Sequence, residues 1–358
     1  MNSGLIQLEN IIYGSYVKMD KLSSLTMHTF SNTSIAGATE LNIFVDVYSI
    51  IKSVFSEHTR VDISDNTAIT TGLINMCSHY RSFFASLSVK TNFFLVSSFN
   101  VCDINEKFVS KYNGKFKEKM EIPMYNQVVM DNFALLELLC PYLPDIHFIR
   151  SPRNYESSII MAHLIETVNN GSPNLIISKD IYPMQLCYLY PYTSYLLPCK
   201  YRGFDTSLMV PISEKKSFRK EFWNLFGKFR TFDISSLYDV SPLNFTLFLA
   251  INGFKERNIY PVLANAPSTK NIITHFVGED DIKIYPEQMY KDEDISSKIP
   301  VALVESRMKA IDIQYILPYY RNDPESKSIK LQNLVDHSAI NAINARFFSH
   351  NPIDLQKL

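Results

Sequence analysis

Four apolar runs in the first half of the chain alternate with segments that have helical spacing. The runs are residues 41–49, 91–98, 145–151 and 174–178, and the helical segments between and beside them include 50–55, 67–89, 130–143 and 154–168. Apolar runs without alternation are typical of strands covered on both faces. We therefore predict an α/β fold, with a mostly parallel central sheet flanked by helices.

The second half of the chain has few strand signals and several helical ones. Residues 213–229, 241–253, 298–317 and 331–348 have the apolar spacing of helices. We therefore expect a largely helical region after the sheet. The predicted boundaries are 1–40 for an N-terminal extension, 41–190 for the α/β domain, 191–300 for a helical region and 301–358 for a C-terminal helical segment.

Composition and charge narrow the classes of protein. A formal net charge of -1 gives no overall signal for nucleic acid, although a basic face balanced by acids elsewhere remains open. The five cysteines form no C-x-x-C pair, which argues against a zinc or disulfide framework and favours a reducing compartment. The start of the chain lacks the apolar run of a signal peptide, and no window is apolar enough to span a membrane. We expect a cytoplasmic or otherwise intracellular protein without membrane association.

Three acidic residues stand at or just after predicted strand ends: Asp46, Glu156 and Asp180. In open α/β sheets, ligands bind at the carboxyl ends of the strands, so three carboxylates from separate elements would meet there and hold Mg²⁺ or Mn²⁺. The alternative is that these acids cap helices or lie in solvated turns, and spacing alone favours this alternative.

Four segments in order resemble the 5′-nuclease superfamily, which includes flap endonucleases, phage 5′-3′ exonucleases and, more distantly, PIN domains. They are FVDVYSIIKSVF, NYESSIIMAHLI, SKDIYPMQL and INGFKERNIYPVLANAPSTKNIITHF, which lie within residues 41–280. The resemblance implies that Asp46, Glu156 and Asp180 stand on metal-ligand positions. It also implies a helix-three-turn-helix element in the last segment.

Several positions that carry chemistry in the family are altered here. Ser158, Ile159, Tyr182, Phe254 and Arg257 stand where the motifs have aspartates, and Ser97 or Ser98 replaces a further one. A two-metal centre needs several carboxylates to offset the repulsion between the cations. The resemblance therefore implies a degenerate site in which the three remaining carboxylates hold one ion weakly or pair with Arg257 instead.

The family's nucleic-acid contacts are also altered. Ala264 and Ala266 stand on glycine positions of the phosphate-gripping loop and Ser268 on a lysine position, while Lys270 partly compensates. The segment KFVSKYNGKFKEK falls where relatives carry an arch over the single strand, and its lysines and aromatics suit single-stranded nucleic acid. An ordinary solvated helix is an equal alternative. The predicted nucleic-acid-binding residues are Lys107, Lys111, Tyr112, Lys115, Lys117 and Lys270.

Three functions follow from these features. The first hypothesis is a catalytically impaired nuclease homologue that binds branched or single-stranded DNA, or that acts as a scaffold with a protein partner in viral or phage replication, recombination or transcription. The second is an active Mg²⁺-dependent 5′-3′ exonuclease or flap endonuclease with a rearranged site. The third is a purely structural, protein-binding subunit. A resident cofactor is expected only for the second.

Overall fold

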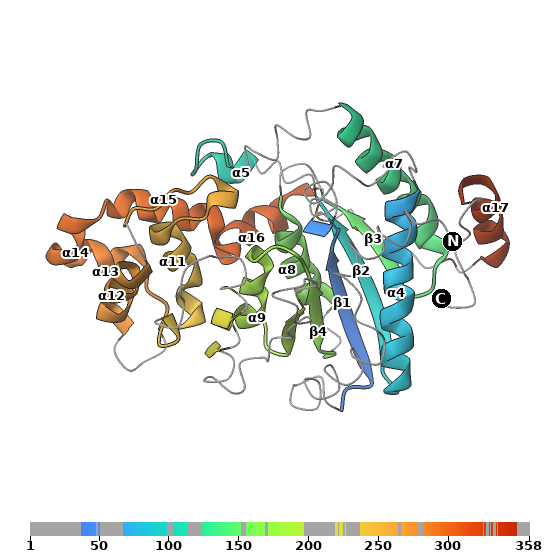
Figure 1. Ribbon diagram of the computed structural model, residues 1–358, viewed down its shortest axis with the longest axis horizontal. Coiled ribbons are helices and arrows are strands. Elements are labelled where there is room, and N and C mark those ends of the chain that lie inside the picture. Colours follow the sequence, from blue (N-terminus) through green and yellow to red (C-terminus); the bar gives the residue numbers. More distant parts are fainter. Residues whose placement is uncertain are drawn as a thin grey trace.

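The computed structural model places a parallel sheet beside a helical half (Figure 1). It describes residues 37–47, 49–50, 67–98, 103–112, 123–151, 155–168, 171–196, 219–220, 222–224, 226, 237–263, 266–277, 282–324, 326, 329, 331, 334 and 336–348.

The sheet has five parallel strands in the order β3-β2-β1-β4-β5. The strands are β1 (Glu40–Asp46), β2 (Lys90–Ser97), β3 (Ile146–Arg150), β4 (Asn174–Ile177) and β5 (Thr193–Leu196). The first four confirm the α/β prediction. The fifth was missed because its sequence, TSYL, is short and half polar. The strand order makes β1 and β4 neighbours at the centre of the sheet, where the direction of winding reverses.

Helices cover both faces of the sheet because its central strands are apolar on both sides. Ile43 and Val45 share a core with α4 (Ala68–Ser86) and α7 (Pro123–Leu139). Phe44 instead belongs to the core that contains α8 (Ser157–Val168). Since successive residues of a strand point to opposite faces, Asp46 extends the Phe44 side of β1 and lies towards α8.

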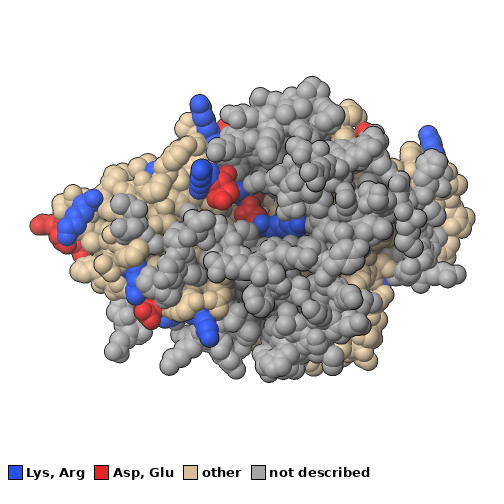
Figure 2. Space-filling model, in the orientation of Figure 1, with Lys and Arg blue, Asp and Glu red and all other residues tan. Residues whose placement is uncertain are grey.

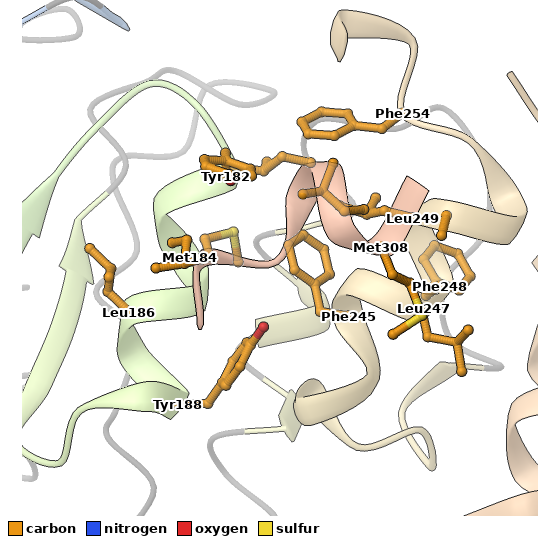
Figure 3. Close-up of a cluster of buried hydrophobic side chains, with 14 of the residues drawn as sticks. Tyr182, Met184, Leu186, Tyr188, Phe245, Leu247, Phe248, Leu249, Phe254 and Met308 are labelled. Carbon is orange, nitrogen blue, oxygen red and sulfur yellow. The ribbon is translucent and has the colours of Figure 1, made fainter. Parts of the chain in front are cut away.

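The second half is helical, as predicted. Its elements are η4 (Pro242–Asn244), α11 (Phe245–Asn252), η5 (Lys255–Arg257), α12 (Ala266–Val277), α13 (Pro286–Lys291), α14 (Glu293–Lys298), α15 (Val301–Ile311) and α16 (Ile313–Asn322). After the sheet's fourth strand come η2 (Tyr182–Met184) and α9 (Gln185–Leu189). Side chains from this stretch meet those of α11 and α15 in one apolar cluster (Figure 3). The two halves therefore share a core.

Three peripheral segments complete the described fold. The short helix α5 (Asp103–Glu106) lies against α15, and the 3-10 turn η1 (Cys140–Tyr142) packs against α17 (His337–Phe347) on the other side of the sheet (Figure 1). Within the predicted helical segment 213–229, Phe222, Trp223 and Phe226 are fully buried and belong to the core. No described helix has the length and hydropathy needed to cross a bilayer.

Candidate functional site

The structure brings the three predicted carboxylates to one place at the carboxyl edge of the sheet. Asp46 ends β1, Asp180 follows β4, and Glu156 directly precedes α8. This is the switch point between β1 and β4, where open α/β sheets form a crevice. Asp46 and Glu156 are each 2% exposed, so neither is a solvated turn residue, whereas Asp46 Oδ1 accepts from Ser49 N as the helix-cap alternative predicts.

A buried guanidinium lies between two of these carboxylates. Arg257 Nε donates to Glu156 Oε1 at 3.0 Å, and Arg257 Nη2 donates to Glu156 Oε2 at 3.1 Å and to Asp180 Oδ2 at 2.6 Å. Its side chain is 2% exposed. Burial alone would lower the pKa of Arg257, but Asp180 and Glu156 outweigh it, so the pKa is raised well above its ordinary value. Burial also raises the pKa of Glu156, against the influence of Arg257.

Asp46 is held by hydroxyl groups. Its Oδ1 accepts from Ser157 Oγ at 2.8 Å and from Ser49 N at 3.2 Å, while its Oδ2 accepts from Ser178 Oγ at 2.8 Å. Burial, and then the nearby charge of Asp180, raise its pKa from 3.8 to about 6, although these hydrogen bonds work in the opposite direction. The sequence did not identify Ser157 or Ser178 as hydrogen-bond partners of Asp46. The contact with Ser49 could have been predicted, because Ser49 follows Asp46 by three residues, the spacing at which an aspartate caps a helix.

Two aromatic rings flank the guanidinium. Arg257 Cζ lies 5.3 Å from the ring centroid of Tyr182 and 5.3 Å from that of Phe254. Cation–π contacts of this kind strengthen when they are shielded from water. Both rings stand on positions where the family resemblance has aspartates, as does Arg257 itself. The three replacements therefore act together, because the rings and the guanidinium contact one another. We refer to Arg257, Tyr182 and Phe254 as the arginine clamp.

Arg257 lies in a tight loop after α11, and this loop places its side chain at the edge of the sheet. Phe254 and Ile259 exchange backbone hydrogen bonds of 2.7 and 3.0 Å, which closes the loop around η5. Gly253 starts the loop with φ +89, and a Cβ at this position would come within 2.8 Å of the Pro261 nitrogen. Only glycine combines this backbone conformation with so close an approach.

We expect Gly253→Ala to lower the free energy of unfolding by about 2 kcal/mol, since it adds strain at positive φ and a contact with backbone. Urea unfolding would measure this loss. Gly171→Ala is the matched control, because Gly171 has φ +77 but a Cβ added there would meet nothing within 4 Å. Equal losses in the two variants would contradict a specific role for the Pro261 contact.

The residues at the site do not fit a two-metal centre. Both carboxylate oxygens of Glu156 and Oδ2 of Asp180 already accept hydrogen bonds from Arg257, and Asp180 Oδ1 accepts from the Tyr182 backbone nitrogen. Ser158 Oγ, on an aspartate position, is buried without a hydrogen-bond partner among the described residues. Within the described part of the chain, no group of three or more His, Cys, Asp or Glu side chains is arranged to hold a metal. The predicted pairing with Arg257 is observed for Glu156 and Asp180, whereas Asp46 accepts hydrogen bonds from Ser157, Ser178 and Ser49 instead.

The predicted nucleic-acid residues have different positions. Lys107 and Lys111 are exposed, whereas Lys115 and Lys117 lie outside the described residues. Tyr112 is 1% exposed, so the prediction that it stacks on a base is corrected: its ring is part of the core. It also lies close enough to Glu156 and Arg257 to influence the pKa of each.

Lys270 differs from the exposed lysines in having a carboxylate partner. It lies near the start of α12 and pairs with Asp239 at 3.1 Å. Its charge is therefore partly neutralised, and its predicted contact with phosphate stays a prediction.

The parallel sheet and the helical half define an α/β protein whose fold is similar to that of solved 5′-exonuclease and flap endonuclease structures. Neither a family model nor a curated protein matches the sequence.

Solved structures from bacteriophage T5 do match. One is a variant of the T5 D15 flap endonuclease, described as a pseudo-enzyme–product complex with DNA and metal ions; it is 13% identical with a TM-score of 0.52, covering 86% of this chain and 98% of that one. The T5 5′-exonuclease with bound zinc ions is 14% identical, with a TM-score of 0.51 and coverage of 86% and 98%. The T5 D15 protein co-crystallised with metal ions is 14% identical, with a TM-score of 0.51 and coverage of 88% and 98%.

Proposed function

We propose that this protein is a catalytically impaired 5′-nuclease homologue that binds nucleic acid. The observation that carries the proposal is the salt-bridged Arg257, which neutralises two of the three remaining carboxylates of the crevice. Phosphodiester hydrolysis in a two-metal site needs those carboxylates for the cations that stabilise the attacking and leaving oxygens. With the guanidinium in place, the crevice lacks the ligands for that chemistry.

Nucleic-acid binding is supported by the fold and by its solved neighbours, one of which is described as a complex with DNA. The loss of catalytic ligands does not remove a surface that recognises phosphates. We propose that the protein serves as a binding or scaffolding component, together with a protein partner, in the replication, recombination or transcription of viral or phage DNA. The phage origin of the solved neighbours supports this setting. An intracellular location fits the same role.

We expect no cleavage of a labelled 5′-flap duplex in Mg²⁺ or Mn²⁺, and salt-sensitive binding of the same substrate in a mobility-shift assay. Glu156→Gln is the control, since it removes a residual ligand position and should leave the cleavage baseline unchanged.

Two other outcomes would overturn the proposal. Cleavage that Glu156→Gln abolishes would identify an active exonuclease or flap endonuclease with a rearranged site. Absence of both cleavage and binding, with a protein that co-purifies in fixed proportion, would identify a structural subunit.

A further inference from the structure

Most of the charged side chains on the face in Figure 2 lie beside charges of opposite sign, and no continuous basic face is visible among the residues drawn in colour. Individual lysines nevertheless differ in their partners. Five described lysines form ion pairs with carboxylates: Lys90, Lys270, Lys283, Lys298 and Lys309. Lys107, Lys111 and Lys255 are exposed and form no ion pair with another described residue.

These three lysines come from two segments that contact each other. Asn258 Nδ2, in the loop that carries Arg257, donates to the backbone oxygen of Ser110 at 3.0 Å. Each lysine is close to this hydrogen bond. Lys111 is the residue after Ser110, and the oxygen of Lys255 accepts from the Asn258 backbone nitrogen at 3.1 Å. With consecutive Cα atoms about 3.8 Å apart, the backbones of Lys111 and Lys255 lie within roughly 15 Å of each other.

Both segments are fixed rather than loosely attached. On one side, Ser306 Oγ donates to the Phe108 oxygen at 2.7 Å, and Asn105 Nδ2 donates to the Ala310 oxygen. On the other side, the arginine clamp and the Phe254–Ile259 bridge hold the loop. A surface that is ordered before it binds loses less conformational entropy on binding.

An exposed aromatic ring lies in the same loop. Tyr260 is 60% exposed and is followed by Pro261, which is also exposed. Exposed aromatic rings that lie beside lysines suit single-stranded nucleic acid, since bases stack on the ring and the lysines contact the phosphates. Glu106 and Glu256 lie in the same two segments, so they reduce the positive charge without cancelling that of the three lysines.

We propose that Lys107, Lys111, Lys255 and Tyr260 form one contact surface for single-stranded nucleic acid. This inference rests on the proposed nucleic-acid binding and assigns to it two residues, Lys255 and Tyr260, from a loop that the family motifs do not connect with the single strand. The surface spans the junction between the α5 segment and the loop after α11.

The test uses the full chain and a fluorescein-labelled oligothymidylate, with affinity measured by fluorescence anisotropy across a salt series. Lys111→Ala with Lys255→Ala should weaken binding and reduce the slope of log affinity against log salt by about 0.7 per lysine. Lys220→Ala with Lys291→Ala is the matched control. Both control lysines are exposed and form no ion pair with another described residue, but they belong to neither segment. This control should leave affinity and slope unchanged.

Tyr260 separates base stacking from simple charge attraction. Tyr260→Ala should weaken oligothymidylate binding about tenfold, whereas Tyr260→Phe should retain it, because the ring rather than the hydroxyl provides the stacking surface. Competition by polyglutamate that matches competition by unlabelled oligothymidylate, with no effect of Tyr260→Ala, would mean a general anion surface and would overturn the inference.

The failure of this inference differs from the failure of the proposed function. If the unmodified protein binds oligothymidylate but the double lysine variant behaves like its control, the contact surface is wrong and nucleic-acid binding stands. If the unmodified protein binds neither oligothymidylate nor the flap duplex, both are overturned.

Discussion

Replacing Arg257 with alanine should lower the free energy of unfolding by about 3–5 kcal/mol, the range observed when one partner of a buried ion pair is removed. The change leaves the buried charge of Glu156 and the partly buried charge of Asp180 without their shared cation. It also removes the guanidinium that lies 5.3 Å from the ring centroids of both Tyr182 and Phe254. Urea unfolding at neutral pH measures the loss.

Arg321→Ala is the control for this prediction. Arg321 pairs with Glu166, but their side chains are 46% and 30% exposed. Exposed pairs contribute about 0–1 kcal/mol, so the control should lose little stability. Equal losses at Arg257 and Arg321 would mean that burial of the first pair has no special consequence.

A second comparison tests whether Arg257 acts as an internal counter-ion. In Arg257→Ala the three carboxylates of the crevice would lack a cation, so Mn²⁺ should raise the Tm of this variant and leave that of the unmodified protein unchanged. A double variant tests the same pairing without metal. Combining Arg257→Met with Glu156→Gln should lower the free energy of unfolding by less than the sum of the two single changes, since the double variant leaves fewer unpaired charges. Additive losses, with no response to Mn²⁺, would contradict the internal counter-ion.

We expect ionisation of Asp46 to lower the free energy of unfolding as pH rises, and we expect Asp46→Asn to abolish this pH dependence. Its pKa is raised from 3.8 to about 6 in the folded state. Between these values the unfolded chain has already lost the proton that the folded chain retains, so stability falls as pH rises and levels off above about pH 6. A shift of this size corresponds to about 3 kcal/mol.

The measurement is the difference in unfolding free energy between the unmodified protein and Asp46→Asn, taken from pH 4 to pH 7.5 with urea as denaturant. The variant should become relatively more stable by about 3 kcal/mol across this interval, because asparagine does not ionise. Its one carbonyl oxygen keeps only one of the two serine hydrogen bonds, which changes stability by an amount that does not depend on pH. Asp145→Asn is a useful control, since Asp145 forms an exposed pair with Lys90 far from the crevice. A constant difference for Asp46→Asn across the pH range would show that burial does not perturb the carboxyl.

The sequence alone predicted much of the fold, for a physical reason. Strands β1, β2 and β4 are covered on both faces, so their sequences are continuous apolar runs that differ clearly from the helical spacing between them. The strand β5 was not predicted because four residues form too short a pattern, and its burial comes from neighbours distant in sequence.

The site was predicted in part. Asp46, Glu156 and Asp180 could be placed at strand ends from local pattern, and the resemblance to the 5′-nuclease superfamily identified Arg257 as an added positive charge. Sequence spacing could not place Arg257 between Glu156 and Asp180, which lie 101 and 77 positions away along the chain. Nor could it show that Tyr112 is buried, since the lysines around it suggested an exposed segment.

For this protein, the sequence by itself determined the alternation of strands and helices and the three carboxylates at the edge of the sheet, because both depend on short stretches of chain. Tertiary structure decided what those carboxylates contact. The pairing of Glu156 and Asp180 with Arg257, the contact of the Tyr182 ring with its guanidinium, and the hydrogen bond from Asn258 to the Ser110 oxygen all join segments far apart in the chain. Such contacts depend on how the helical half packs against the sheet, which no local pattern encodes.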